Sequence, residues 1–235
     1  MGLTNVEYTG NEKGNVLFLI LIAVALFAAL SYAVTQSTQS GGGDAGSETS
    51  LVNSAQLTQY PASVRTSVVR MIIGGTDVSQ LEFNPSSDFD DCTNSGRVCV
   101  FHPSGGGATS TEAPGSVMAD GGSGTWFFNG AFEIVNIGIS SASSFAGNEV
   151  MAFLPGITQS VCSRINDELG ISGIPAVGTN ISATYRTLKD DSNTFSTSEV
   201  ILGSGGTAAL SGQPFGCFQN DTSGEFVYYH VLVQQ

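Results

Sequence analysis

The chain has 235 residues and a formal net charge of -13, with seven Lys and Arg against twenty Asp and Glu. Phosphate binding needs clustered basic side chains, so this composition argues against a nucleic-acid partner. Hydrophobic residues make up 41% of the chain, enough for a globular core, which argues against wholesale disorder. We expect one β-rich, loop-rich domain with an appendage.

A 19-residue apolar run, Val16 to Val34, follows a short polar leader. As a helix it reaches roughly 28 Å at about 1.5 Å per residue, close to the ~30 Å hydrocarbon core of a bilayer. A secretion signal usually has a basic start and about 7 to 15 apolar residues, whereas two Glu and a single Lys13 precede this run. A membrane span is therefore favoured over a signal cut after Ala33. The amino end should be cytoplasmic, because Lys13 precedes the run and no Lys or Arg follows it until Arg65.

The junction of leader and run, Lys13-Gly14 followed by Asn15 and Val16, resembles that of type IV prepilins. In this family of pilins and type II secretion pseudopilins, a prepilin peptidase cuts after the glycine and the new amino terminus is methylated. The apolar helix first anchors the subunit in the membrane and later packs in the filament core. The resemblance implies cleavage between Gly14 and Asn15. It implies these membrane and filament-core residues: Val16, Leu17, Phe18, Leu19, Ile20, Leu21, Ile22, Val24, Leu26, Phe27, Leu30 and Val34.

Two positions depart from the family pattern. The family usually has Phe or Met directly after the cut and Glu at the fifth mature position, where this chain has Asn15 and Leu19. The family's glutamate is thought to pair with a neighbouring subunit's amino terminus, and pairing is what makes a buried charge tolerable. With Leu19 that pairing is absent, which favours a minor or initiating subunit, or a divergent branch of the family.

A glycine-rich tract and an amphipathic stretch follow the run. Each glycine costs about 1 kcal/mol relative to Ala inside a helix, so a break or hinge is expected at Gly41, Gly42, Gly43 and Gly46. Over 48–73, apolar residues recur three or four positions apart, which predicts an amphipathic helix. Pro61 should kink or restart this helix, and Gly74-Gly75 should end it.

The rest of the chain reads as strands around a second helix. The helix is expected within 154–171, with Pro155 in its first turn and Gly170 at its end. Strands are predicted at 98–102, 125–129, 132–139, 183–188, 199–202 and 225–233, the last with few polar positions, as in a central strand. An antiparallel sheet packed on the amphipathic helix is the simplest architecture.

The four cysteines favour disulfides over a metal or redox motif, because none forms a CxxC pair. Three pairings are possible. We favour Cys92 with Cys99, which flank a turn-like segment, and Cys162 with Cys217. The latter arrangement resembles the disulfide that delimits a carboxyl-terminal region in type IV pilins. Free buried thiols remain the alternative.

Catalytic and metal-binding motifs are sparse. His102 and His230 lack a neighbouring nucleophile motif. Asp88, Asp90 and Asp91 offer oxygen ligands suited to calcium, but their spacing is not that of an EF-hand, so a solvated acidic loop is favoured. We predict no enzyme activity, no cofactor and no resident metal.

The resemblance predicts an α+β, pilin-like protein. Its expected layout is a leader (1–14), a transmembrane and filament-core helix (15–40), a Gly-rich hinge (41–47) and an extracytoplasmic head (48–235). Its function would be that of a structural subunit of a type IV pilus-like or pseudopilus filament. Its partners would be copies of itself or related pilins, the inner membrane before assembly, the prepilin peptidase and the assembly machinery. The filament would lie at the bacterial cell surface or in the periplasm. A membrane-tethered binding module that does not polymerise is the alternative, and a secreted enzyme is a third.

Overall fold

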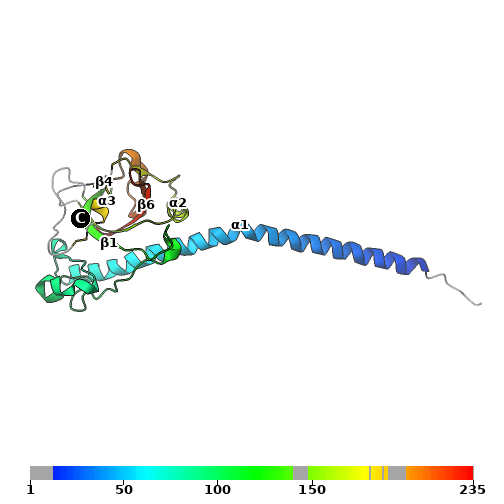
Figure 1. Cartoon of the computed structure of the whole chain (residues 1–235), viewed down its shortest axis with the longest axis horizontal. Coiled ribbons are helices and arrows are strands. Elements are labelled where there is room, and N and C mark those ends of the chain that lie inside the picture. The colour runs from blue at the N-terminus through cyan, green and yellow to red at the C-terminus, as the bar shows by residue number, and fades with distance from the viewer. Residues whose placement is uncertain (1–12, 140–147, 180, 187, 190–199, 235) are drawn as a thin grey trace, which may run out of the picture. The chain divides into compact units, whose positions relative to one another are not determined.

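A computed structural model describes residues 13–139, 148–179, 181–186, 188–189 and 200–234; side chains are not described for 13–16 and 33–51. Most of the expected leader therefore lies outside the described residues. The chain divides into two compact units, Met1–Thr49 and Ser50–Gln235. The first helix, α1 (Lys13–Ile73), contributes residues to both (Figure 1).

The predicted Gly-rich break is wrong. Helix α1 includes Gly41, Gly42, Gly43 and Gly46, and Pro61 also lies inside it. A glycine lowers helix stability by only about 1 kcal/mol, and each added residue of a formed helix contributes another backbone hydrogen bond. The helix therefore continues where composition alone indicated an end.

The predicted transmembrane helix is also wrong. Within the described part of the chain, no helix combines the length and the apolar character that crossing a membrane requires. This finding overturns the expected inner-membrane stage and the localisation built on it.

The carboxyl-terminal part of α1 is amphipathic, as predicted. Leu57, Val64, Val68 and Met71 are buried in the core of the second unit. The helix ends in a Schellman motif, in which the N–H of Gly75 donates to the carbonyl of Ile72 and the N–H of Thr76 to that of Met71. Gly75 has φ +98°, the left-handed conformation that this motif requires.

The second unit is built on one six-stranded sheet, which curves into a half-barrel (Figure 1). Its strand order is β3-β5-β6-β2-β1-β4. The strands are β1 (Phe127–Ile134), β2 (Glu149–Pro155), β3 (Ala176–Val177), β4 (Val200–Leu202), β5 (Phe215–Asn220) and β6 (Glu225–Val233). The helices of this unit besides α1 are α2 (Gln159–Glu168) and α3 (Ser182–Tyr185).

The sheet is mixed, which corrects the antiparallel sheet expected from the sequence. The central pairs β5/β6, β6/β2 and β2/β1 are antiparallel, but the edge strands β3 and β4 run parallel to β5 and β1. Both edge strands are short and return to the sheet through long connections, and long connections are what parallel neighbours need. The fold class is α+β, as expected.

Several predicted strands differ from the structure. The stretch 98–102 contributes only an isolated bridge between Glu82 and Cys99, and 183–188 overlaps the short helix α3. The stretches 125–129 and 132–139 give one strand, β1, whose register shifts between Asn129 and Phe132. Strands β2 and β5 were not predicted. Helix α2 begins at Gln159, after an N-cap at Thr158, because the preceding apolar residues belong to β2.

Each face of the sheet carries a core. One core joins the sheet to α1 and α2 and contains Leu57, Ile165 and Tyr228. The other lies on the opposite face, around Phe153 and Tyr229. The central strands are therefore buried on both sides, which explains the lack of polar alternation in β6.

We expect Gly75→Ala to lower the free energy of unfolding by about 1 to 2 kcal/mol, because alanine is strained at φ +98° even though no atom would contact its Cβ. Gly178→Ala is the matched control: its Cβ also has open space, and its φ is not in the left-handed region. Urea unfolding of both variants checks this, and equal stabilities would contradict it.

Candidate functional site

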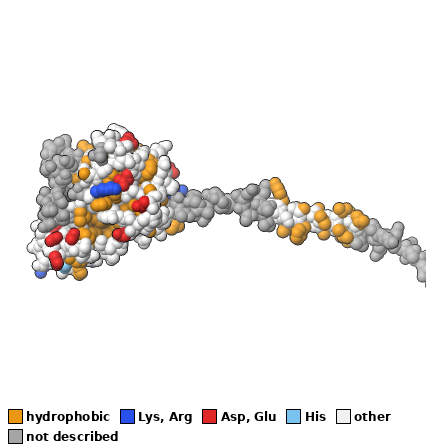
Figure 2. Space-filling model, in the orientation of Figure 1, with side chains coloured by type: hydrophobic (Ala, Val, Ile, Leu, Met, Phe, Trp, Pro, Cys, Tyr) orange, Lys and Arg blue, Asp and Glu red, His pale blue; other side chains and the backbone are white. Residues whose placement is uncertain are grey.

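The first unit presents an apolar segment, defined here as residues 17–32 of α1. It contains no Asp, Glu, Lys or Arg. Figure 2 shows its orange side chains standing out from the helix along this stretch. The large exposed side chains are Leu17, Phe18, Leu19, Ile20, Leu21, Ile22, Val24, Leu26, Phe27, Leu30 and Tyr32.

The apolar segment is exposed on every side. Successive helix residues point about 100° apart, so four in a row sample all directions around the axis. Leu17, Phe18, Leu19 and Ile20 are exposed by 64%, 62%, 59% and 58%. A helix that is hydrophobic all round normally lies in a protein interior or another apolar environment, so this segment is a candidate association site.

The remaining predicted residues of the leader, filament core and hinge have no described side chains. Gly14, Asn15, Val16 and Val34 are part of α1, as are the four hinge glycines, but only their backbone is described. Cleavage between Gly14 and Asn15 therefore stays a prediction.

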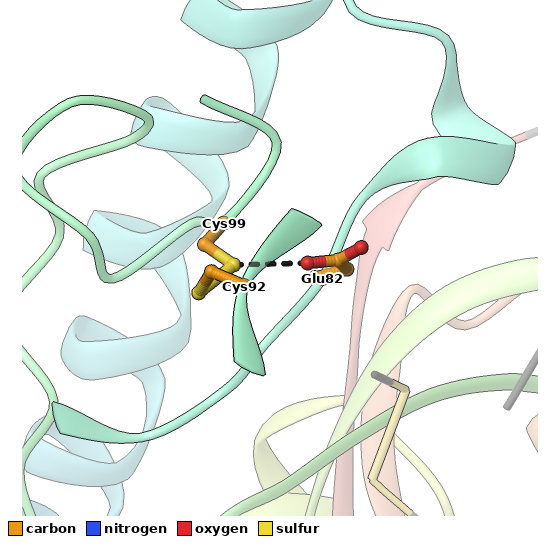
Figure 3. A group of neighbouring side chains, drawn as sticks. All are labelled: Glu82, Cys92 and Cys99. Atoms are coloured by element: carbon orange, nitrogen blue, oxygen red, sulfur yellow. Dashed lines mark hydrogen bonds between the residues drawn. A yellow bond between two sulfur atoms is a disulfide. The ribbon is translucent and has the colours of Figure 1, made fainter. Parts of the chain in front are cut away.

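The Cys92–Cys99 disulfide forms as favoured by the sequence, beside a buried carboxylate (Figure 3). Thr93 donates to Glu82 from both its N–H and its hydroxyl, with N–H to Oε2 at 3.0 Å. The Cys99 Sγ lies 3.0 Å from the same Oε2. Glu82, which the sequence analysis did not single out, thus fixes the loop that the disulfide closes.

This loop does not offer a thiolate metal site. Ligand atoms of Glu82, Cys92 and Cys99 lie within 4.8 Å of one another, but both sulfurs are used in the disulfide. The calcium candidates Asp88, Asp90 and Asp91 are all exposed and are not brought together with a further ligating side chain among the described residues.

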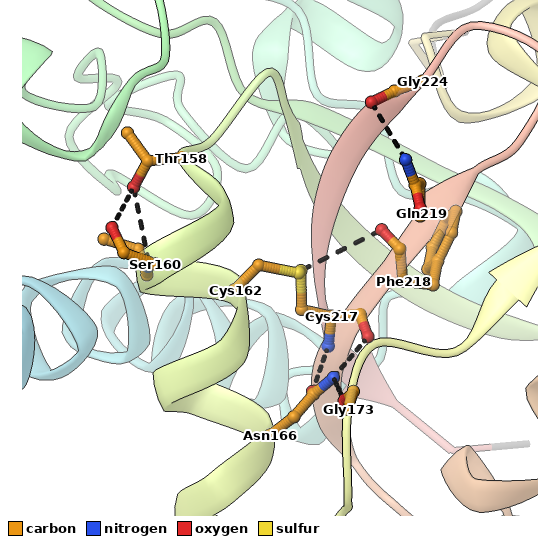
Figure 4. Close-up of a disulfide and its surroundings, with 10 residues drawn as sticks. Thr158, Ser160, Cys162, Asn166, Gly173, Cys217, Phe218, Gln219 and Gly224 are labelled. Atoms are coloured by element: carbon orange, nitrogen blue, oxygen red, sulfur yellow. Dashed lines mark hydrogen bonds between the residues drawn. A yellow bond between two sulfur atoms is a disulfide. The ribbon is translucent and has the colours of Figure 1, made fainter.

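The Cys162–Cys217 disulfide also forms as favoured, and it joins α2 to β5 (Figure 4). Beside it, the fully buried Asn166 accepts a hydrogen bond from the N–H of Cys217 and donates to its carbonyl, both at 3.0 Å. Its Nδ2 also donates to the carbonyl of Gly173 at 3.1 Å. The asparagine amide therefore binds β5 as a neighbouring peptide group would.

Both histidines take part in packing and hydrogen bonding within the fold. His102 accepts a hydrogen bond from the N–H of Ser104 and packs against Gly96, where a Cβ would lie 2.3 Å from the ring. His230 is buried, bonds the Tyr228 hydroxyl at 2.9 Å and stacks on Phe215. Burial, with a smaller contribution from the Arg65 charge, lowers the pKa of His230 to about 4.

Glu149 is a second buried carboxylate that the sequence did not reveal. Its Oε2 accepts from the N–H of Ile134 at 3.0 Å, but its Oε1 has no hydrogen-bond partner in the described structure. Burial raises the pKa of Glu149 to about 7, opposed by the Ile134 hydrogen bond and assisted by the nearby Glu133 carboxylate. The protonated form of Glu149 therefore predominates in the folded protein below about pH 7.

Comparison with known proteins gives no relative: no family model, no curated protein and no solved structure matches this chain.

Replacing both cysteines of a pair by alanine should destabilise the second unit unequally. The Cys162–Cys217 pair is separated by 55 residues and the Cys92–Cys99 pair by 7. Loop-closure entropy then predicts losses of about 4 and about 2 kcal/mol, respectively. Urea denaturation of the two double variants measures this difference. A larger loss for the shorter loop would show that Glu82 and its contacts, rather than chain entropy, dominate.

Glu149→Gln should change the pH dependence of stability. Because folding raises the pKa of Glu149 from 4.5 to about 7, its stabilising contribution is complete below pH 4.5 and is lost as pH rises through 7. Over this interval, the free energy of unfolding of the variant should rise relative to that of the wild type by up to about 3 kcal/mol. His230 titrates in both proteins, so the difference isolates Glu149. Parallel stability curves from urea unfolding at pH 4 to 8 would contradict this assignment.

Proposed function

We propose that this chain is a structural subunit of a type IV pilus-like filament, which assembles through the apolar segment. The observation that carries the proposal is the exposure of this segment on every side. The Lys13-Gly14-Asn15 junction is a second argument, because it resembles the processing site of prepilins. In this proposal, a prepilin-type peptidase removes residues 1–14, and the protein acts by assembly rather than by catalysis.

The energetics favour an occupant that surrounds the helix. Burying one Leu, Ile or Phe side chain contributes about 1.5 to 3 kcal/mol, and the segment offers eleven large exposed hydrophobic residues. A partner with a single groove would cover one face only. Several copies of the same helix, packed in a bundle, cover all faces and leave no like charges in contact, because the segment carries none.

Leu19 indicates how such a bundle would be held together. It is 59% exposed and lies among other apolar side chains, and the segment contains no carboxylate. Assembly would then depend on apolar burial and not on an ion pair with a neighbour's amino terminus. A filament held this way should tolerate high salt, since screening weakens only charge interactions.

Phe27→Lys should abolish assembly of the chain that begins at Asn15. Phe27 is 77% exposed in the single chain, so the substitution leaves folding intact, but in a bundle it buries an ammonium without a partner. Sedimentation and negative-stain electron microscopy after removal of mild detergent would measure filament formation.

Ile73→Lys is the matched control, because Ile73 is 81% exposed on the same helix but lies outside the apolar segment. The wild type and Ile73→Lys should form filaments that persist at high salt, and Phe27→Lys should remain monomeric. Dispersed wild-type monomers, or loss of filaments in both variants, would contradict the proposal.

A further inference from the structure

The second unit contains a pocket of about 250 Å³ that the proposed filament role does not use. Its walls come from the carboxyl-terminal part of α1, from the loops before β1 and from the start of β1. The aromatic lining residues are Tyr60, Phe83, Phe101, Trp126, Phe127 and Phe128. Since ligand sites for drug-sized molecules usually measure about 300 to 1,000 Å³, this pocket fits a compact group.

The aromatic rings hold one another in place. Tyr60 and Trp126 lie with ring centroids 5.2 Å apart, tilted by 49°. Phe83 and Phe128 stack at 4.9 Å, and Phe101 meets Phe128 edge to face at 5.4 Å. Rings fixed by their neighbours need little reordering when a ligand enters, so the pocket is preorganised.

The charge at the pocket selects the sign of its ligand. Glu112 is the only charged side chain among the described residues that line the pocket, and it is exposed at the protein surface. The chain as a whole carries a net charge of -13, which repels anions. The lining offers one carboxylate and no cluster of carboxylates, so it is poorly suited to bind a small metal ion.

A lining of aromatic rings with one carboxylate suits a bulky, weakly hydrated organic cation. Ring faces attract such a cation through their quadrupoles, and recognition of quaternary ammonium groups is the established use of this interaction. Ser110, Thr111 and Thr125 supply hydroxyls to the same pocket, suited to a polar tail.

We propose that this pocket binds a small quaternary ammonium compound of the choline class, with the trimethylammonium group against the aromatic rings and near Glu112. The site is independent of the apolar segment, so it stands whether or not the chain forms filaments.

Trp126 is the only tryptophan in the chain, so its fluorescence reports on the pocket directly. Choline chloride added to the full chain should change this fluorescence with saturation, relative to sodium chloride at equal ionic strength. The neutral isostere 3,3-dimethylbutan-1-ol has the same shape without the charge. Its affinity should be lower than that of choline by a factor of about ten or more. Equal binding of the two compounds, or no saturable change, would overturn the proposal.

Glu112→Gln tests the carboxylate, with Asp221→Asn as its matched control. Both acids are exposed, and Asp221 lies outside the pocket, in the turn between β5 and β6. Choline affinity should fall about threefold to tenfold in Glu112→Gln and stay unchanged in Asp221→Asn. Tyr60→Leu should weaken choline binding further, with circular dichroism confirming the fold. Equal affinities of the wild type and both acid variants would show that Glu112 does not contribute to binding. That result would overturn the argument for a cation.

Discussion

The second unit depends on burial of the β2/β6 pair from both sides. Six residues of β2 pair with β6, with Val150 opposite Val233 and Pro155 opposite Val227. Tyr228 enters the core shared with α1 and α2, and Tyr229 enters the core on the other face. Because both tyrosines are fully buried, neither core can form without this strand pair, and the helices on each face pack against a surface already fixed by backbone hydrogen bonds.

The sequence predicted the features that have a local pattern. The stripe in the carboxyl-terminal part of α1 follows a helical period. Strand β6 follows a turn signal and is rich in β-branched and aromatic residues. Strand β2 escaped prediction because its residues are buried on both faces and therefore show no alternation. Helix α3 spans only four residues, and the parallel edges depend on connections that no local pattern encodes.

The candidate sites divide in the same way. Uniform hydrophobicity identified the apolar segment from the sequence, but no helix in the described part of the chain meets the requirements of a membrane span. Glycine content overestimated the tendency of the helix to break. The contacts of Glu82 and Glu149 join residues 11 to 17 positions apart, whereas Asn166 and Cys217 lie 51 positions apart. In the aromatic pocket, Tyr60 and Thr111 are also separated by 51 positions. Only the tertiary structure brings such groups together.

The pairing of Asn166 with Cys217 has a consequence for how the sheet is specified. Cys217 belongs to one core and its neighbour Phe218 to the other. A slip of β5 by one residue would exchange these faces along the strand. The disulfide to α2, together with two hydrogen bonds from one amide, ties Cys217 to a fixed point on the helix. The disulfide therefore does more than restrict the conformations of the unfolded chain. It also selects a single alignment of β5 from the neighbouring alternatives.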